Sequence, residues 1–336
     1  MTEDEWTLSL FRVLPKNPNT KPNGRSVLVQ HGAAMDAAYW LYVAKFTQKK
    51  YWNDVPAFLK LADDGYDVWM GNNRGTRYSN ENPRWPNADK HDFKEYLYPE
   101  ENFDKYDFSF FEMGKFDVPS MLDKIIDVSG NEMVSYVGYS QGTAQLFYGL
   151  ASNEEAYKDK IERAIMLAPC VYTNTAGLDF YLETYPVFRE HGVNVYNDMM
   201  AVTNMAKICS DPKDQTACEF FSSVMTMQKQ AIKSGEHFDQ IAIADRYQEY
   251  IVGFNATNIQ SELVKPGLGA ISTVPIHLMV AENDEICTHA TAERIQKEIG
   301  ERVQSFTTVP GVGHEYFMIE ANSDEFYTQL KGLLEK

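Results

Sequence analysis

The sequence predicts an α/β protein with a mostly parallel central sheet and one long helical insertion. Short apolar runs that end in glycine or polar turns alternate with segments whose apolar residues recur at helical spacing. A serine between two glycines stands where one such strand meets a helix. Strand alternation stops over residues 171–273 and then resumes. We therefore expect residues 1–170 and 274–336 to form the core and 171–273 to be inserted as a cap.

The elements of the first half follow one another in β-α-β order. Residues 26–32 (SVLVQHG) and 66–75 (YDVWMGNNRG) each indicate a buried strand that enters a glycine turn. Two segments between them, 37–50 and 54–65, have helical spacing. Further along, a helix is predicted over 110–130, and the strand at 133–140 runs into a helix at 141–152. Because parallel strands need such crossovers, this order favours a parallel sheet.

Composition excludes several classes of protein. The chain has 336 residues and 44% apolar residues, which is typical of a folded globular protein. Its formal charge of −17 would repel a phosphate backbone, so nucleic acid is not expected as a partner. No apolar run approaches the roughly 20 residues that a transmembrane helix needs. The acidic start, MTEDEWTLSLFRV, lacks the pattern of a secretory signal, so we expect either an intracellular protein or a trimmed chain.

Ser140 is the candidate nucleophile because of its neighbours. With Gly138 and Gly142 it forms Gly-x-Ser-x-Gly, in which the small residues allow a sharp turn that presents the serine oxygen above the sheet edge. The N-terminus of the following helix points free backbone N–H groups at the same place. We therefore expect a developing negative charge beside Ser140 to be stabilised there.

The histidine that serves as base must follow the nucleophile and an acid in the order found in α/β hydrolases. Six of the seven histidines are placed elsewhere. His31 and His91 precede Ser140, and His191 and His237 fall in the insertion. His277 lies in an apolar strand, and His289 opens a helix. We interpret the one in the strand as a core residue. His314 remains, in a glycine-rich loop after the last predicted strand. It is the predicted general base.

Asp284 is the best placed acid. The loop after the strand at 274–281 offers Glu282, Asp284 and Glu285, and the other two are interpreted as solvated loop residues. Asp284 precedes His314 by enough chain for one helix and one strand, which returns the chain to the same sheet edge. Its role would be to hold the imidazole in the right tautomer.

The oxyanion hole is expected to use two backbone N–H groups. Gln141, directly after the nucleophile, supplies one. Ala33 follows the first strong strand and supplies the other, and Gly32 allows the close approach. No metal or organic cofactor is expected for this chemistry.

Several motifs together carry a resemblance to a known family. They are, in order, QHGAAMDAAYW, LADDGYDVWMGNNRGTRYS, YDFSFFEMGKFDVPSMLD, YVGYSQGTAQ, IMLAP, ENDEICTHA and GVGHEYF. The chain resembles the gastric and lysosomal acid lipases over nearly its whole length. The resemblance implies an α/β-hydrolase fold, the triad Ser140, Asp284 and His314, oxyanion donors at Ala33 and Gln141, and a cap with a movable lid. The chain departs from the family at Ala33 and Ala34, where larger apolar residues are common, and at Tyr139, where a histidine is common.

Two covalent features are also expected. Cys209 and Cys218 are close enough in sequence to close a small loop, although the cysteine count alone leaves free thiols open. The resemblance to acid lipases favours the disulfide, because the disulfide of that family lies in the cap. Asn255 begins the only Asn-x-Ser/Thr sequon and is the candidate glycosylation site if the protein is secreted. The resemblance implies a secreted or lysosomal location, and the sequence itself leaves a cytoplasmic one open.

The sequence therefore predicts a serine carboxylic-ester hydrolase, a lipase that cleaves neutral lipid esters such as triacylglycerols or sterol esters at a lipid–water interface. One alternative is a soluble esterase for short acyl chains, which the small residues Ala33 and Ala34 favour. Another is a lipid-binding protein without catalysis that keeps the hydrolase shape. Residues 171–273 could also bind a protein partner instead of covering a pocket.

Overall fold

A computed structural model of the chain describes residues 1–33, 35–41, 55–85, 107–174, 177–190, 231–319 and 323–336. Within these residues seven strands form one sheet in the order β1-β3-β2-β4-β5-β6-β7. Only β1 runs antiparallel to its neighbour, β3, and each of the other pairs is parallel. The predicted α/β class with a mostly parallel sheet is confirmed. The strands are β1 (Leu10–Val13), β2 (Ser26–Gln30), β3 (Asp67–Gly71), β4 (Val134–Tyr139), β5 (Ile161–Leu167), β6 (Ile276–Ala281) and β7 (Val303–Val309).

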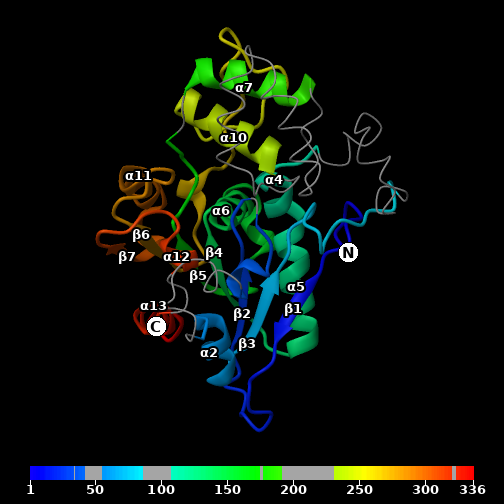
Figure 1. Cartoon of the computed structure of the whole chain (residues 1–336), viewed down its shortest axis with the longest axis vertical. Helices are drawn as coiled ribbons and strands as arrows, with labels where there is room; N and C mark the ends of the chain where they lie inside the picture. The colour runs from blue at the N-terminus through cyan, green and yellow to red at the C-terminus, as the bar shows by residue number, and fades with distance from the viewer. Residues whose placement is uncertain (34, 42–54, 86–106, 175–176, 191–230, 320–322) are drawn as a thin grey trace.

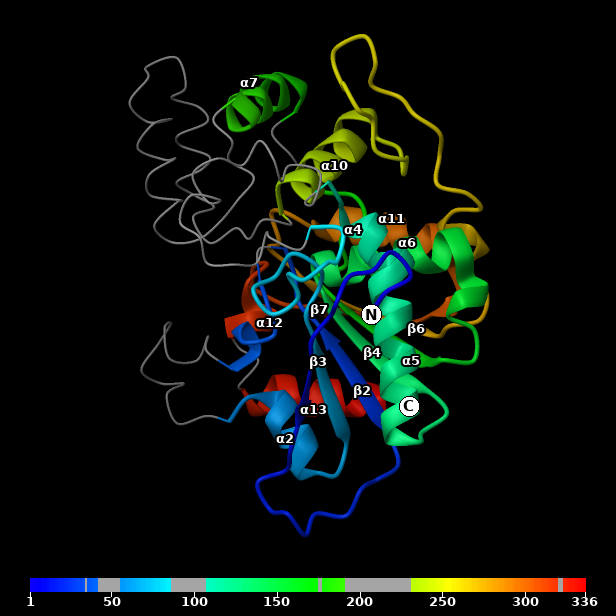
Figure 2. The same ribbon diagram turned by 90° about the vertical axis from the view of Figure 1, so that its right-hand side faces the viewer.

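Helices cover both faces of the sheet (Figures 1 and 2). The helices are α2 (Ala57–Asp63), α4 (Phe110–Glu112), α5 (Val118–Ser129), α6 (Gln141–Asn153), α7 (Leu178–Glu190), α10 (Ala231–Ala244), α11 (His289–Ile299), α12 (Tyr316–Ile319) and α13 (Asp324–Leu334). A π-helical turn, Met113–Asp117, joins α4 to α5, and 3₁₀ turns span Glu154–Ala156, Leu268–Ala270 and Gly300–Arg302.

Alternate residues of the buried strands face two separate cores, because successive side chains of a strand point to opposite faces. In β2, Leu28 packs into the core beneath α4, α5, α6 and α11. Val27 and Val29 pack instead into the core with α2, α12 and α13. Since both faces are covered, every residue of β2 and β4 is buried, as expected for strands of a parallel sheet.

Local signals in the sequence explain where several helices begin and end. Ser109 starts α4 with a capping box, in which its hydroxyl accepts from Phe111 N and Glu112 accepts from Ser109 N. Gly130 ends α5 in the left-handed region with φ of 73°. The helix predicted over 54–65 is α2. Most of the helix predicted over 37–50 lies outside the described residues.

Helices α7 and α10 come from the interval 171–273 and lie together beyond the carboxyl-terminal edge of the sheet (Figure 1). The Tyr185 hydroxyl of α7 donates to Asp239 of α10 at 2.8 Å. Helix α10 packs on α4, where the rings of Phe238 and Phe110 stack with centroids 4.3 Å apart. The division into a core and a cap at 171–273 stays a prediction, because residues 191–230 lie outside the described part.

Candidate active site

The turn between β4 and α6 places Ser140 at the carboxyl-terminal edge of the sheet. Ser140 has φ of 52° and ψ of −118°, a backbone conformation that residues other than glycine rarely adopt. Its flanking glycines are required by close contacts. A Cβ at Gly138 would lie 2.8 Å from the Gly142 carbonyl oxygen, and one at Gly142 would lie 2.6 Å from the Gln30 carbonyl oxygen. The predicted sharp strand-to-helix turn is therefore present.

His314 lies against Ser140. It follows β7 on a loop that turns at Gly311, whose φ is 73°. The distance from His314 Nε2 to Ser140 Oγ is 2.9 Å. The Tyr139 hydroxyl donates to the carbonyl oxygen of His314 at 3.1 Å and so ties the loop to the residue before the serine. An imidazole nitrogen at this distance is positioned to accept the serine proton.

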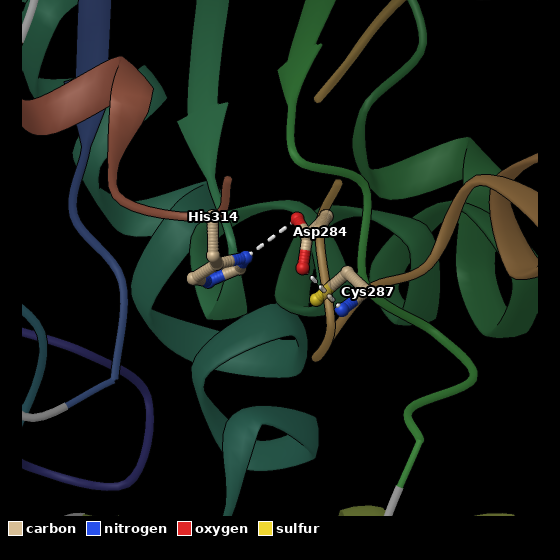
Figure 3. Close-up of side chains that lie close together, drawn as sticks. All are labelled: Asp284, Cys287 and His314. Carbon is tan, nitrogen blue, oxygen red and sulfur yellow. Dashed lines mark hydrogen bonds and ion pairs between the residues drawn. The ribbon is translucent and has the colours of Figure 1, made fainter. Parts of the chain in front are cut away.

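Asp284 holds the other side of the imidazole. Its side chain is buried, and Oδ2 lies 2.7 Å from His314 Nδ1 (Figure 3). Because β6 and β7 are parallel neighbours, with Ala281 opposite Val309, the loops that follow them meet at one edge. The carboxylate accepts the Nδ1–H, which leaves Nε2 as the acceptor facing Ser140. The structure thus brings Ser140, His314 and Asp284 into one hydrogen-bonded series.

The predicted oxyanion donors flank Ser140. Gln141 is the first residue of α6, so its N–H lies at the positive end of the helix. The turn before Ala33 passes closely over the serine, since a Cβ at Gly32 would lie 3.2 Å from Ser140 Cβ. Neither N–H donates to an acceptor among the described residues. Their role as an oxyanion hole stays a prediction.

The other described histidines are engaged elsewhere. Burial lowers the pKa of His31 to about 4, and its Nε2 accepts from Asn73 N at 3.2 Å. His277 is buried with Nδ1 2.8 Å from Ser305 Oγ, and burial lowers its pKa to about 4, so its interpretation as a core residue is confirmed. His237 is buried in α10, and His289 opens α11. His91 and His191 lie outside the described residues.

A disulfide that the sequence did not predict lies beside this site. Cys170, just after β5, is bonded to Cys287, in the loop that carries Asp284, and their Cα atoms are 5.2 Å apart. The pairing could have been predicted from the adjacency of β5 and β6 in a parallel sheet, because this adjacency brings the loops after both strands together. Cys209 and Cys218 lie outside the described residues, so that predicted disulfide stays a prediction.

Asp284, Cys287 and His314 offer three metal-ligating atoms within 4.8 Å of one another (Figure 3). The donor set does not suit a metal, because the Cys287 sulfur is bonded to Cys170 and the Asp284 carboxylate is hydrogen-bonded to His314. We interpret the group as an acid–base pair next to a disulfide.

Asn255 is exposed and its side-chain oxygen accepts from Thr257 N at 2.9 Å. Glycosylation there stays a prediction. No helix in the described parts of the chain is long and apolar enough to cross a membrane.

A family model described as the alpha/beta hydrolase fold matches residues 25–321, and the chain belongs to this family. Mouse gastric triacylglycerol lipase is 34% identical over 171 residues, which cover 50% of this chain and 38% of that protein. Lipase 3 of Drosophila melanogaster is 32% identical over 174 residues, 51% of this chain and 38% of the relative. These matches confirm the resemblance to acid lipases over about half of the chain, and its extension over nearly the whole length stays a prediction. The chain spans only 33% to 39% of the length of such curated relatives.

Solved structures share the fold at low sequence identity. An esterase from Exiguobacterium antarcticum has a TM-score of 0.54 at 14% identity, covering 100% of this chain and 98% of that one. A thermophilic esterase from Thermogutta terrifontis has a TM-score of 0.54 at 12% identity, covering 100% and 97%. At these identities the likeness extends to the fold alone.

Proposed function

We propose that this protein is a serine carboxylic-ester hydrolase that cleaves neutral lipid esters, such as triacylglycerols or sterol esters, through an acyl-enzyme on Ser140. The observation that carries the proposal is the hydrogen-bonded series from Ser140 Oγ to His314, at 2.9 Å, and from His314 to Asp284, at 2.7 Å. A nucleophile, a base and an orienting acid in this geometry are the parts that acyl transfer needs.

Each residue has one role in the proposed reaction. His314 Nε2 takes the Ser140 proton as the serine oxygen attacks the ester carbonyl. The N–H groups of Ala33 and Gln141 hold the oxyanion of the tetrahedral intermediate. His314 then gives the proton to the leaving alcohol, and water activated by the same imidazole releases the fatty acid. Asp284 stabilises the imidazolium in both steps.

The lipid substrate is supported by the relatives, two of which are named as triacylglycerol lipases. We place the acyl and alcohol groups under a cap formed by residues 171–273, since α7 and α10 lie beyond the sheet edge that carries Ser140 (Figure 1). A disulfide in the core supports an oxidising compartment, which fits a secreted or lysosomal protein.

A soluble esterase for short acyl chains is the second candidate. It is favoured by the small residues Ala33 and Ala34, at sequence positions where acid lipases commonly carry larger apolar residues.

Hydrolysis of p-nitrophenyl esters of increasing acyl length, at acidic and neutral pH, tests both candidates. We expect turnover that rises with chain length and falls by at least about 10⁴-fold in Ser140→Ala, because the covalent intermediate is lost. Preference for acetate or butyrate would support the short-chain esterase. Full activity in the Ser140→Ala variant, or none in folded wild type, would overturn the proposal.

A further inference from the structure

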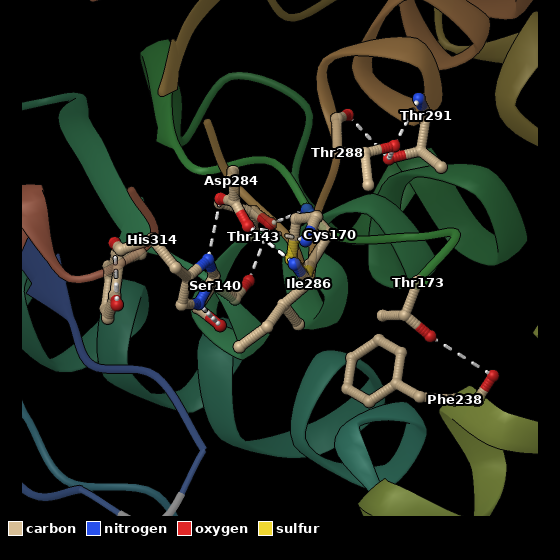
Figure 4. The surroundings of a disulfide bond; sticks show 12 residues. Ser140, Thr143, Cys170, Thr173, Phe238, Asp284, Ile286, Thr288, Thr291 and His314 are labelled. Atoms are coloured by element: carbon tan, nitrogen blue, oxygen red, sulfur yellow. Dashed lines mark hydrogen bonds and ion pairs between the residues drawn. A yellow bond between two sulfur atoms is a disulfide. The ribbon is translucent and has the colours of Figure 1, made fainter. Parts of the chain in front are cut away.

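The disulfide Cys170–Cys287 joins the loop that follows β5 to the loop that carries Asp284. Cys170 follows β5 and Cys287 follows Asp284 by three residues. Both cysteines are buried, at 2% and 0% exposure. Ser140, Thr143, Cys170, Asp284 and His314 lie gathered around the bond (Figure 4).

On one side the disulfide reaches the acid. Asp284 Oδ1 accepts hydrogen bonds from the backbone N–H groups of Ile286 at 2.9 Å and Cys287 at 2.8 Å. These bonds occupy one carboxylate oxygen and leave Oδ2 for His314. The backbone at Cys287 therefore fixes the orientation of the Asp284 carboxylate.

On the other side it reaches the nucleophile. The Cys170 N–H donates to Thr143 Oγ1 at 2.8 Å, and the Thr143 hydroxyl donates to the Ser140 carbonyl oxygen at 2.6 Å. Hydrogen bonds also join Ser140 to His314 and His314 to Asp284. Together with the disulfide, these contacts form a closed circuit around the site.

Before Asp284, backbone hydrogen bonds hold the acid loop to β7 and to the loop that carries His314: the Glu282 N–H donates to the Val309 carbonyl oxygen at 3.0 Å and the Asn283 N–H to that of Val312 at 2.9 Å. Glu282, Asn283, Glu285 and Ile286 are exposed, and Asp284 is the buried residue among them. Besides the disulfide, the segment after β5 holds this loop through the Asn174 N–H, which donates to the Ile286 carbonyl oxygen at 2.8 Å. After Asp284, the disulfide and the Asn174 bond hold the loop. Their loss would free this side of the loop, and a carboxylate misplaced by about 1 Å can cost about 10²-fold in rate.

We propose that the Cys170–Cys287 disulfide positions Asp284, and through it His314, against Ser140. Both cysteines are then positioning residues, and the proposal rests on the proposed hydrolase function. The bond also closes a loop of the chain that contains the whole interval 171–273. A disulfide that only stabilises the fold would change unfolding without acting through Asp284.

The test compares wild type, Cys170→Ala/Cys287→Ala, Asp284→Ala and the variant that combines all three substitutions. Turnover of p-nitrophenyl butyrate is measured per active serine, counted by stoichiometric labelling with paraoxon. We expect the disulfide variant to lose about tenfold to a hundredfold in kcat with KM changed less than twofold. In the Asp284→Ala background the same substitutions should cost less than twofold, because residues that act as a unit are not additive.

Leu330→Ala is the matched control for stability. Leu330 is buried in α13, on the face of the sheet opposite α6. Its loss should lower the melting temperature without lowering kcat per active serine. An equal kcat loss in this control, or a full additional loss in the Asp284→Ala background, would assign the disulfide a stabilising role only.

Two measurements keep the test decisive if the double variant does not fold. Cys170→Val/Cys287→Ala fills the buried volume with an apolar group and is assayed at 10 °C. In a Cys209→Ala/Cys218→Ala background, dithiothreitol reduces the Cys170–Cys287 bond to two thiols while becoming a cyclic disulfide. Because Cys287 is buried, iodoacetamide labelling of quenched samples in denaturant counts the reduced fraction. We expect kcat to fall in proportion to that fraction. Wild-type kcat at full reduction would overturn the positioning role alone, whereas activity in Ser140→Ala would overturn the hydrolase function.

Discussion

At the scale of single residues, the site depends on a backbone that is held in an unfavourable conformation. Ser140 adopts φ of 52° without being a glycine, and Thr143 N and the Thr143 hydroxyl both donate to its carbonyl oxygen. The turn can form because the flanking glycines let β4 and α6 approach each other and β2 closely. A side chain at either glycine position would push the serine away from His314.

Gly142→Ala tests this close approach. The added Cβ would lie 2.6 Å from the Gln30 carbonyl oxygen and 2.9 Å from that of His31, and neither backbone atom can move freely. We expect a loss of about 1 to 3 kcal/mol in the free energy of unfolding and a large fall in ester turnover. Urea unfolding monitored by fluorescence measures the first and p-nitrophenyl butyrate the second.

Gly332→Ala is the matched control, because Gly332 also lies inside a helix and an added Cβ there would meet nothing within 4 Å. We expect it to stabilise the protein by about 0.5 to 1 kcal/mol. Equal effects of the two substitutions would show that the β4–α6 turn has no special need of glycine.

At the scale of elements, a buried ion cluster joins three segments that are distant in sequence. Arg74, after β3, pairs with Asp117 of the π-helical turn at 2.7 Å and with Asp4 of the N-terminal segment at 2.6 Å. The Arg74 backbone N–H also donates to Asp117 Oδ2 at 3.0 Å. Arg74 and Asp117 are almost fully buried, so each needs the other to offset desolvation.

Asp117→Asn should therefore destabilise the protein far more than Asp4→Asn. Loss of the buried carboxylate leaves a buried guanidinium poorly compensated, and we expect a cost of about 3 to 5 kcal/mol. The Asp4 side chain is 25% exposed, so its loss should cost about 1 kcal/mol. The two urea unfolding midpoints give the comparison. Similar costs would contradict the view that burial makes Asp117 the principal partner.

At the scale of the whole molecule, neutral histidines are buried in separate regions. His31 directly follows β2, and His237 is a residue of α10 whose ring packs against α4. His237 Nε2 is 3.0 Å from the Gln248 carbonyl oxygen and Nδ1 is 3.2 Å from Ser109 Oγ, so the neutral ring has both partners it needs. Burial lowers the pKa of His237 to about 3 and that of His31 to about 4.

Acidification should therefore cost stability through these rings. Between about pH 6.5, where an unfolded histidine titrates, and about pH 3, the unfolded chain binds a proton that folded His237 does not. We expect His237→Gln to lose about 2 to 3 kcal/mol less than wild type on going from pH 7 to pH 4.5. Urea unfolding at both pH values measures the difference, in which the other titrating groups cancel. Parallel pH dependence in the two proteins would refute the prediction.

The order of strands and helices and the choice of Ser140, Asp284 and His314 could be predicted from the sequence. Strand and helix periods are local, and a parallel sheet brings the residues that follow its strands to one edge. Chain order, compared with the order found in α/β hydrolases, therefore grouped the three side chains. Helices α2 and α5 end near the last residues of the segments predicted as helices, 54–65 and 110–130, each of which closes on a glycine. The extent of the cap was also predicted from the periodicity of the sequence. It stays a prediction, because residues 191–230 lie outside the described part of the chain.

By itself the sequence determined the α/β class, the position of the serine turn and the residues at the sheet edge, because strand and helix periods are local and their order along the chain brings the ends of parallel strands to one edge. Only the tertiary structure decided that Cys170 pairs with Cys287, that Arg74 pairs with Asp117 and that His237 is buried neutral. These pairings depend on which strands are adjacent and which helices pack together. No local period carries that information, since it arises only when both faces of the sheet are covered.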